Sequence, residues 1–258
     1  MTGEANDMNS EAIKAAVQEY YAGRVRGQTC CAPAAESPGC CAAATEPSGC
    51  CAPDAGIEGA DAREDIPSYG CGTPFDASLF HEGEVIVDLG SGPGRDALLA
   101  ARAVGATGRV IGVDMTPEML ESATAAAGRS GITNVEFRLG DIEALPLAGG
   151  CADVVISNCV LSLVPDKRKA FAEALRILRP GGRLIVNDIL TEEALPEAAR
   201  DDLQAWAACV SGAITEGEYR SMLVDVGFVD VAITPNGEGV GVSTYSARVT
   251  ARRPGQAE

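Results

Sequence analysis

VIVDLGSGPGRD (residues 85–96) is the most informative stretch of this 258-residue chain. It begins as a short apolar run, which predicts a buried strand, and it ends in a cluster of glycines. The helical pattern RDALLAARAVG (95–105) follows, and then a second apolar run, RVIGVD (109–114). A strand, a helix and a second strand in this order predict a parallel βαβ unit.

The same alternation of strands and helices continues through the rest of the chain. Thr116 and Pro117 mark a helix start, because Thr is a good N-cap and Pro suits the first helical position. Seven apolar runs predict a doubly wound α/β fold whose sheet is mostly parallel, with an antiparallel pair at one edge. The expected strands are 85–90, 109–114, 134–141, 152–158, 182–189, 228–235 and 243–252, and the expected helices are 9–24, 95–105, 116–131, 166–182 and two within 196–226.

Four regions of the chain differ in composition. Residues 1–26 predict a short N-terminal helix, and residues 27–65 form a flexible arm of small residues that cannot bury a core. The arm repeats every ten residues, and its units open with the cysteine pairs Cys30 and Cys31, Cys40 and Cys41, and Cys50 and Cys51. Residues 66–195 predict the main ligand-binding domain, and residues 196–258 add helices and closing strands to the same fold unit.

Charge and hydropathy limit the classes of function. The formal net charge is −17 and Lys and Arg form no large cluster, so we expect no nucleic-acid partner. No segment reaches the roughly 18 apolar residues of a membrane span, and the start MTGEANDMNSEAIK lacks a secretory pattern. These features predict a cytoplasmic protein without a membrane partner. Because a reducing cytoplasm disfavours structural disulfides, the ten cysteines indicate metal binding, catalysis or redox chemistry.

The glycine-rich turn after the first strand predicts a cofactor site. Glycines let a ligand approach the backbone, and the helix that begins there presents unpaired N–H groups. From Asp88 the run reads D-x-G-x-G-x-G, with Gly90, Ser91 and Gly92 at its centre, and it differs from the G-x-G-x-x-G of dinucleotide folds. It is similar to the first motif of the class I methyltransferases, which use S-adenosylmethionine. The alternative interpretation is that the glycines only build a tight strand–helix turn.

Residues after the next three strands agree with that cofactor. Asp114 closes the second strand, where an acidic residue typically accepts hydrogen bonds from a ribose diol. Met115 follows it and could pack on an adenine ring. Asp141 and Ile142, after the third strand, resemble a contact to the adenine amino group. Asn158, at the end of the fourth strand, either lines the pocket or caps the strand.

Three cysteines outside the arm lie on segments that could converge over the predicted cofactor. Cys71 precedes the α/β pattern, Cys159 follows the fourth strand, and Cys209 lies in a helix after the fifth. Ligands in such sheets bind beyond the carboxyl ends of the strands. A single cysteine of this kind is more often a small buried hydrophobe, but three on converging segments favour a shared site. Cys151 has no such position, and we expect it in a loop or at a strand edge.

Five segments together resemble the arsenite methyltransferase family: SYGCGTP (68–74), DLGSGPGRD (88–96), GVDMTPEML (112–120), SNCVLSLVPDK (157–167) and WAACVSGA (206–213). Ordinary class I methyltransferases share the glycine motif but not the cysteines of SYGCG and SNCV. The resemblance implies a seven-stranded, Rossmann-like class I methyltransferase sheet. It also implies an S-adenosylmethionine-dependent enzyme that methylates trivalent arsenic and serves arsenic detoxification.

The resemblance further implies roles for individual residues. It makes Cys71, Cys159 and Cys209 the thiols that bind arsenic. It makes six residues the cofactor contacts: Asp88, Gly90, Gly92, Asp114, Met115 and Asp141. We add Ser91, Ile142 and Asn158 to this cofactor site. The implied substrates are arsenite and methylarsenite. The implied partner is a thiol reductant, thioredoxin or glutathione, because two of the thiols would form a disulfide as the product leaves.

The chemistry is consistent with that resemblance. Arsenite is neutral near pH 7 and thiophilic, so soft thiolates select it without help from net charge. Three thiolates leave pyramidal As(III) with a lone pair that can attack a sulfonium methyl group once both reactants are held in place. The nucleophile carries no proton, so no general base is required. The single histidine, His81, lies outside the motifs and is expected at the surface.

Two other functions remain compatible with these residues. The first is a methyltransferase for a carbon or oxygen nucleophile, which predicts that alanine at Cys159 or Cys209 leaves turnover nearly intact. The second is a non-catalytic thiol protein that sequesters soft metals, which predicts stoichiometric binding and no methylated product. The position of the cysteines in cofactor-proximal segments favours arsenite methylation over both.

The arm generates a test of its own. The family usually carries a fourth cysteine upstream of SYGCG, and the arm offers six, whose vicinal pairs can chelate As(III). If the arm captures arsenite, deletion of residues 27–60 should weaken arsenite affinity about tenfold or more. A tenfold change corresponds to a loss of about 1.4 kcal/mol of binding free energy. Equilibrium binding of arsenite to the deleted and full-length chains measures this. Unchanged affinity would mean that the arm is a low-complexity expansion.

Overall fold

The described part of the chain is built around one mixed sheet. The computed structural model describes residues 4–26, 66, 75–196, 206–207, 209–238 and 243–255. The sheet has eight strands, seven of them in the order β3-β2-β1-β4-β5-β8-β7, with β6 paired to β5. The strands are β1 (Val85–Leu89), β2 (Arg109–Asp114), β3 (Val135–Leu139), β4 (Ala152–Asn158), β5 (Leu178–Thr191), β6 (Ile214–Thr215), β7 (Val229–Glu238) and β8 (Thr244–Arg252).

Strand pairing confirms the predicted doubly wound α/β fold. β1 pairs in parallel with β2 and with β4, β2 with β3, and β4 with β5. β8 runs antiparallel to both β5 and β7, which places the predicted antiparallel pair at the sheet edge. All seven predicted strands are present. The eighth, β6, is a two-residue strand that pairs with Leu190 and Thr191.

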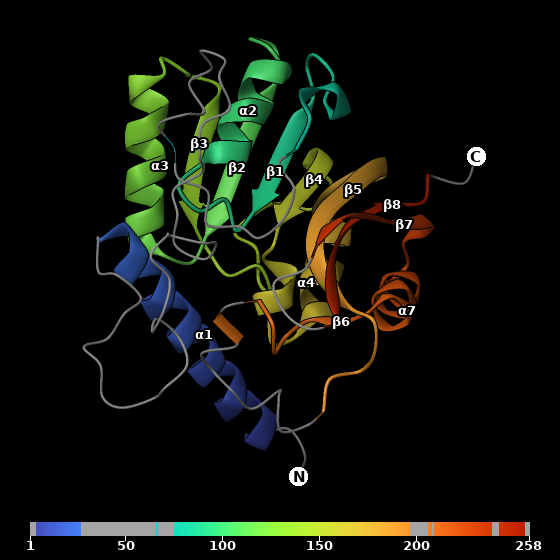
Figure 1. Ribbon diagram of the computed structural model, residues 1–258. Coiled ribbons are helices and arrows are strands. Elements are labelled where there is room, and N and C mark those ends of the chain that lie inside the picture. Colours follow the sequence, from blue (N-terminus) through green and yellow to red (C-terminus); the bar gives the residue numbers. More distant parts are fainter. Residues whose placement is uncertain are drawn as a thin grey trace.

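Helices cover both faces of this sheet. Those described in full are α1 (Glu4–Val25), α2 (Arg95–Ala103), α3 (Pro117–Arg129), α4 (Lys167–Ile177) and α7 (Glu216–Val226), with short 3₁₀ helices η1 (Ala77–Leu79) and η2 (Leu161–Leu163). In Figure 1, α2 and α3 lie on one side of the sheet, α4 and α7 on the other, and α1 crosses near the ends toward which the strand arrows point. The two layers bury both faces of the central strands.

The core explains why the central strands are apolar at successive positions. Ile86 and Val154 pack toward α2, whereas their neighbours Val87 and Val155 pack toward α4 and α7. All four side chains are completely buried. A parallel sheet covered on both faces requires this near-continuous apolar pattern, because alternate residues face different helix layers.

The predicted helix boundaries agree with the structure to within about two residues at α2 and α3, but not at the start of α1 or the end of α4. α3 begins at Pro117 as expected, although the Thr116 side chain makes no capping hydrogen bond. The end predicted for α4, near residue 182, is wrong: the helix stops at Ile177 and β5 begins at the next residue. Pro180 supplies the physical reason, because a residue that precedes proline is pushed from helical toward extended backbone.

Several predictions concern residues outside the described ranges. The arm, residues 27–65, lies there, and so do residues 197–205, which carry part of the two helices expected within 196–226. α7 accounts for one of those helices. The N-terminal helix is present and is longer than predicted. Across the described residues, none of the helices combines the length and apolarity needed to traverse a bilayer.

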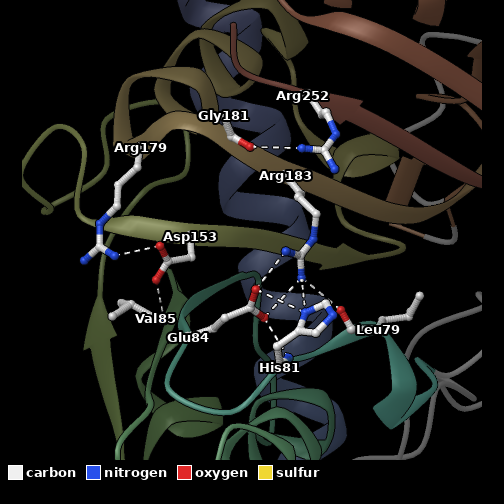
Figure 2. Close-up of polar contacts among 9 residues, drawn as sticks. All are labelled: Leu79, His81, Glu84, Val85, Asp153, Arg179, Gly181, Arg183 and Arg252. Atoms are coloured by element: carbon white, nitrogen blue, oxygen red, sulfur yellow. Dashed lines mark hydrogen bonds and ion pairs between the residues drawn. The ribbon is translucent and has the colours of Figure 1, made fainter. Parts of the chain in front are cut away.

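A polar cluster joins the amino ends of β1, β4 and β5, far from the ends that carry the glycine turn. Figure 2 shows the Arg183 guanidinium pointing at the Glu84 carboxylate, with Nη1–Oε1 and Nη2–Oε2 distances of 2.7 and 3.1 Å. Arg183 also donates to the Leu79 carbonyl at 3.0 Å. Asp153 accepts hydrogen bonds from the Val85 amide and the Arg179 guanidinium. These bonds fix the relative register of three strands.

This cluster predicts a pH-dependent stability contribution. Hydrogen bonds from Arg183 and from the His81 amide, opposing the effect of burial, lower the pKa of Glu84 below its usual 4.5. The contribution is therefore present above pH 4.5 and is lost as the pH falls through the lowered pKa. Glu84→Gln should reduce the free energy of unfolding by about 1–3 kcal/mol at pH 7, and by progressively less below pH 4. Chemical denaturation at both pH values measures this.

The matched control is the exposed pair between Arg168 and Asp225, whose side chains are 54% and 50% exposed. Asp225→Asn should change stability by less than about 0.5 kcal/mol, since exposed ion pairs are weak. An equally small effect of Glu84→Gln would show that the Arg183 cluster is not a stabilising clamp.

Candidate functional site

A pocket opens beyond the carboxyl ends of β1, β2 and β4. The sheet order reverses between β1 and β4, and their connections leave toward opposite faces, so a crevice remains in which ligands of such folds bind. The pocket is open to solvent on one side, and Lys14, Val17 and Tyr21 of α1 form one wall. All nine residues predicted to contact the cofactor line it: Asp88, Gly90, Ser91, Gly92, Asp114, Met115, Asp141, Ile142 and Asn158.

The glycine turn forms the floor of the pocket. Gly90, Gly92 and Gly94 have φ values of 69°, 51° and 90°, a region that residues with a side chain rarely adopt. The amides of Gly90 and Ser91 both donate to the Val113 carbonyl, which ties the turn to the end of β2. A Cβ at Gly90 would meet the Val160 side chain. The turn therefore needs glycine both for its backbone conformation and for close packing.

Asp114 connects the glycine turn with the start of α3. One carboxylate oxygen accepts from the Gly92 amide and the other from the Thr116 amide, both at 2.9 Å. Burial raises the pKa of Asp114, and these hydrogen bonds oppose that rise. Met115 follows, and its carbonyl accepts a hydrogen bond from Gln18 of α1 at 2.9 Å. The end of β2 is thus held rigidly between the turn and α1.

Three carboxylates, the buried Asp88 and the half-buried Asp96 and Asp114, concentrate negative charge at the pocket. Asp88 is 2% exposed, and its Oδ2 has no hydrogen-bond partner among the described residues. Burial first, and then the charges of Asp96 and Asp114, raise the pKa of Asp88 well above its usual value. Burial also raises the pKa of Asp96, to which Asn158 donates at 2.9 Å. Buried charges of one sign need a compensating partner, so the pocket suits a cationic ligand.

Two further polar atoms point to the same conclusion. The Ser91 hydroxyl oxygen and the Asn158 amide oxygen are buried, and neither has a hydrogen-bond partner among the described residues. Both residues line the pocket beside Asp88. Buried polar atoms are nearly always paired, so the three are suited to a ligand that carries donors as well as positive charge.

The N-terminal helix supplies a wall that sequence reasoning did not assign to the site. Lys14 donates to Asp141 at 2.7 Å and to Glu143 at 2.6 Å, across a separation of more than a hundred residues. Val17 and Tyr21 line the pocket from the same helix. The predicted helix indicated an apolar face, but no local pattern indicated which surface that face covers. Arg95, Leu163 and Pro165 are further pocket residues that the sequence did not single out.

One of the three predicted thiols, Cys159, lines this pocket, and a second, Cys209, contacts its backbone. Cys159 lines it and is 2% exposed, while Cys209 is completely buried. The Cys209 thiol donates to the Cys159 carbonyl, with an Sγ–O distance of 3.5 Å. Both belong to one cluster that includes Val17 of α1 and Met115. The fold therefore brings the Cys209 thiol to the backbone of the pocket cysteine, although the two residues are fifty positions apart in sequence.

Both cysteines have an unusual backbone conformation. Their φ values are 57° and 64°, in the left-handed region that non-glycine residues seldom occupy. Such conformations cost about 1–3 kcal/mol each and persist where the surrounding structure holds them. For Cys159 that support includes an amide hydrogen bond to the Asn187 carbonyl at 2.8 Å. Strained backbone at paired thiols is typical of a functional site.

The remaining cysteines complete the comparison with the prediction. Cys71, the third predicted thiol, lies outside the described residues. Cys151 precedes β4 and is half-buried against the core, in the loop or strand-edge position expected for it. Among the residues with described positions, no group of three or more His, Cys, Asp or Glu side chains could hold a metal ion. The described part of the thiol site is thus a pair.

Comparison with known proteins places this pocket in context. Residues 80–227 match a family model described as a methyltransferase domain. The chain is 38% identical over 272 aligned positions to an arsenite methyltransferase of Halobacterium salinarum, an alignment that covers 96% of this chain and 68% of that protein. It is 39% identical to the human arsenite methyltransferase over 62% of this chain, but that alignment covers only 44% of the human protein.

A solved structure agrees with these sequence matches. The crystal structure of CrArsM, an arsenic(III) S-adenosylmethionine methyltransferase from Chlamydomonas reinhardtii, superposes with a TM-score of 0.64 and 34% sequence identity. The superposition covers 76% of this chain and 74% of that structure. The relatives are longer than this chain, which spans 68% of the archaeal protein and less than half of the human one.

The buried carboxylates predict an effect of pH on the ligand-free protein. Burial raises the pKa of Asp88 in the folded protein above 3.8, its usual value in an unfolded chain. Ionised Asp88 therefore destabilises the fold when the pH lies above the raised pKa. This destabilisation disappears as the pH falls toward 3.8. Asp88→Asn should therefore raise the melting temperature at neutral pH, by roughly 2–4 °C for each kcal/mol relieved. The difference should shrink toward pH 4. Thermal unfolding between pH 4 and 8 measures it.

The exposed Asp225 again provides a control, because Asp225→Asn removes a carboxylate without relieving burial. An Asp88→Asn variant that melts at or below the wild-type temperature at neutral pH would contradict the interpretation of an uncompensated buried charge.

Proposed function

Because the chain belongs to the arsenite methyltransferase family, we propose that it transfers the methyl group of S-adenosylmethionine to trivalent arsenic bound by cysteine thiolates. The observation that supports this most directly is that Cys159 lines an acidic pocket and the Cys209 thiol donates a hydrogen bond to the Cys159 carbonyl. The proposed biological role is detoxification of arsenite in the cytoplasm, where reducing conditions keep thiols available.

The pocket fits S-adenosylmethionine on the chemistry of its residues. The cofactor supplies a methyl group activated by a positively charged sulfonium, and it also carries an ammonium group. The buried Asp88 and the half-buried Asp96 are the carboxylates that would offset this positive charge. Asp114 would accept the ribose hydroxyls, and Asp141 and Ile142 would meet the adenine. Gly90, Ser91, Gly92, Met115 and Asn158 would complete the contacts.

The thiols would select the substrate. As(III) prefers soft sulfur ligands, and arsenite is neutral near pH 7, so a strongly acidic protein does not repel it. Cys159 and Cys209 would supply two thiolates, and Cys71 is the proposed third. The same pair would accept methylarsenite as well as arsenite, because both carry at least two hydroxyl groups on arsenic that thiolates can replace.

The chain would accelerate the reaction chiefly by positioning. The arsenic lone pair is a nucleophile without a proton, so no side chain has to act as a general base. The rigid end of β2 and the anchored Cys159 loop would hold two reactants in line, an arrangement that replaces a bimolecular encounter. Val17, Met115 and Leu163 provide an apolar wall around the thiols, which would limit access of water.

Release of the product would require electrons from the thiols. Transfer of a methyl group leaves arsenic formally pentavalent. Two thiolates could return it to the trivalent state by giving up two electrons and forming a disulfide, which frees the methylated product. A dithiol reductant, thioredoxin, or two molecules of glutathione would then reduce the disulfide. This step makes the reductant a required partner of the proposed cycle.

The decisive experiment is turnover of arsenite with S-adenosylmethionine and a thiol reductant, with the products identified by mass spectrometry. Wild-type protein should yield methylated arsenic. Cys159→Ser and Cys209→Ser should each lower turnover by about 100-fold or more, since positioning effects of this kind are large and act as a unit. The matched control is Cys151→Ser, a half-buried thiol outside the pocket, which should retain near-wild-type turnover.

Other results would select the other functions. Confirmed cofactor binding without methylated arsenic would leave a methyltransferase for a carbon or oxygen nucleophile. Stoichiometric arsenite binding without any product would indicate a non-catalytic thiol protein.

A further inference from the structure

A buried charged cluster lies directly behind the Cys159 loop and takes no part in the mechanism above. Lys167, the first residue of α4, is 7% exposed, and Asp188 of β5 is completely buried. Asp188 faces the α4 and α7 side of the sheet, where the Tyr219 hydroxyl donates to its Oδ2 at 3.5 Å. An ammonium and a carboxylate buried this deeply are costly unless they are paired and hydrogen-bonded, so their retention needs a reason.

The Lys167 ammonium is bonded to the thiol-bearing loop itself. Its Nζ donates to the Val164 carbonyl at 3.0 Å and to the Ser162 carbonyl at 3.4 Å. These two carbonyls lie three and five residues beyond the pocket cysteine, Cys159, on the loop that includes η2. Charge-assisted bonds to backbone are stronger than neutral ones, so Lys167 anchors the loop to the core.

Other side-chain donors anchor the same loop from the segment that carries the second thiol. The Trp206 indole N–H donates to the Leu163 carbonyl at 2.9 Å, and the Cys209 thiol donates to the Cys159 carbonyl. The Lys167 ammonium also lies 5.7 Å from the centre of the Trp206 ring. Lys167 therefore contacts both the loop of the first thiol and the segment of the second.

Asp188 supplies the negative charge that makes a buried ammonium tolerable. Burial raises the pKa of Asp188 to about 6, and the charge of Lys167 opposes that rise. The Asp188 carboxylate is therefore ionised at neutral pH. It is itself held by the Ile189 amide at 2.9 Å and by Tyr219, whose ring packs edge-on against Phe171. The charge of Lys167 thus favours the ionised form of a carboxylate that the Ile189 amide and Tyr219 hold in place.

We propose that Lys167 and Asp188 are positioning residues that hold the Cys159 loop against the Cys209 segment, in the arrangement in which the two thiols bind trivalent arsenic. The proposal rests on the proposed function, because it assumes that these two thiols bind arsenic. Lys167 acts through the loop backbone, and Asp188 acts through Lys167. Neither residue is among the described residues that line the cofactor pocket, so the pair should affect arsenic binding and leave cofactor binding alone.

The test compares Lys167→Met and Asp188→Asn with wild type. Trp206 is the single tryptophan of the chain and contacts both thiol segments, so its fluorescence can report arsenite binding. Lys167→Met should raise the arsenite dissociation constant and the KM for arsenite about tenfold, the effect of losing hydrogen bonds from a charged donor. The KM for S-adenosylmethionine should stay within about twofold, a split that general destabilisation would not produce.

The matched control is Lys169→Met, on the same helix but with a side chain that is 60% exposed. It should leave both KM values unchanged. The double variant Lys167→Met/Asp188→Asn should bind arsenite no more weakly than Lys167→Met alone, because removing both charges leaves no uncompensated carboxylate. Additive losses would overturn the pairing of the two residues.

Asp188→Asn keeps the test decisive if Lys167→Met does not fold, because the substitution is isosteric and only removes the charge. Weaker arsenite binding with an unchanged KM for S-adenosylmethionine is expected. An unchanged arsenite dissociation constant would overturn the proposal. Failure of wild-type protein to bind or methylate arsenite would instead reject the proposed function, so the two failures are distinguishable.

Discussion

Parallel pairing of β1 with β2 on one side and β4 on the other is the constraint on which the rest of the structure depends. Because the three strands run in the same direction, their carboxyl ends meet at one edge. The connections after β1 and β4 then leave on opposite faces and open a crevice between them. The glycine turn, Asp114 and the Cys159 loop all follow strand ends at this edge. A single topological feature therefore brings cofactor and thiol residues together.

Charge organises the crevice in two layers. The inner layer is the group of carboxylates Asp88, Asp96 and Asp114, whose pKa values burial raises more than their hydrogen bonds lower them. The outer layer is the pair of ion pairs from Lys14 to Asp141 and Glu143, which ties α1 across the mouth. The inner layer favours a cationic ligand, whereas the outer layer uses its charges to hold a wall in place. Part of the net charge of −17 is thus concentrated at this pocket, where each group of carboxylates has its own role.

The positions of Cys159 and Cys209 depend on contacts with the core side of the Cys159 loop as well as on the pocket. Cys159 and Cys209 both adopt left-handed backbone, which is stable only where neighbouring groups hold it. Lys167 donates a hydrogen bond to the Val164 carbonyl and Trp206 donates one to the Leu163 carbonyl, both on the Cys159 loop. Asp188 offsets the charge of the buried Lys167 ammonium. The same cluster explains why polar residues occupy an otherwise apolar interface between β5, α4 and α7.

The sequence by itself predicted the seven main strands, the mostly parallel sheet with its antiparallel edge pair, and the glycine turn, because these follow from patterns a few residues long. Local motifs and the family resemblance together selected the nine residues that line the pocket. It misjudged the end of α4, where Pro180 favours extended backbone. Only the tertiary structure decided that Lys14 and Tyr21 wall the pocket and that Cys209 reaches Cys159. Those contacts join segments fifty to more than a hundred residues apart, and packing, rather than local periodicity, selects which surfaces meet.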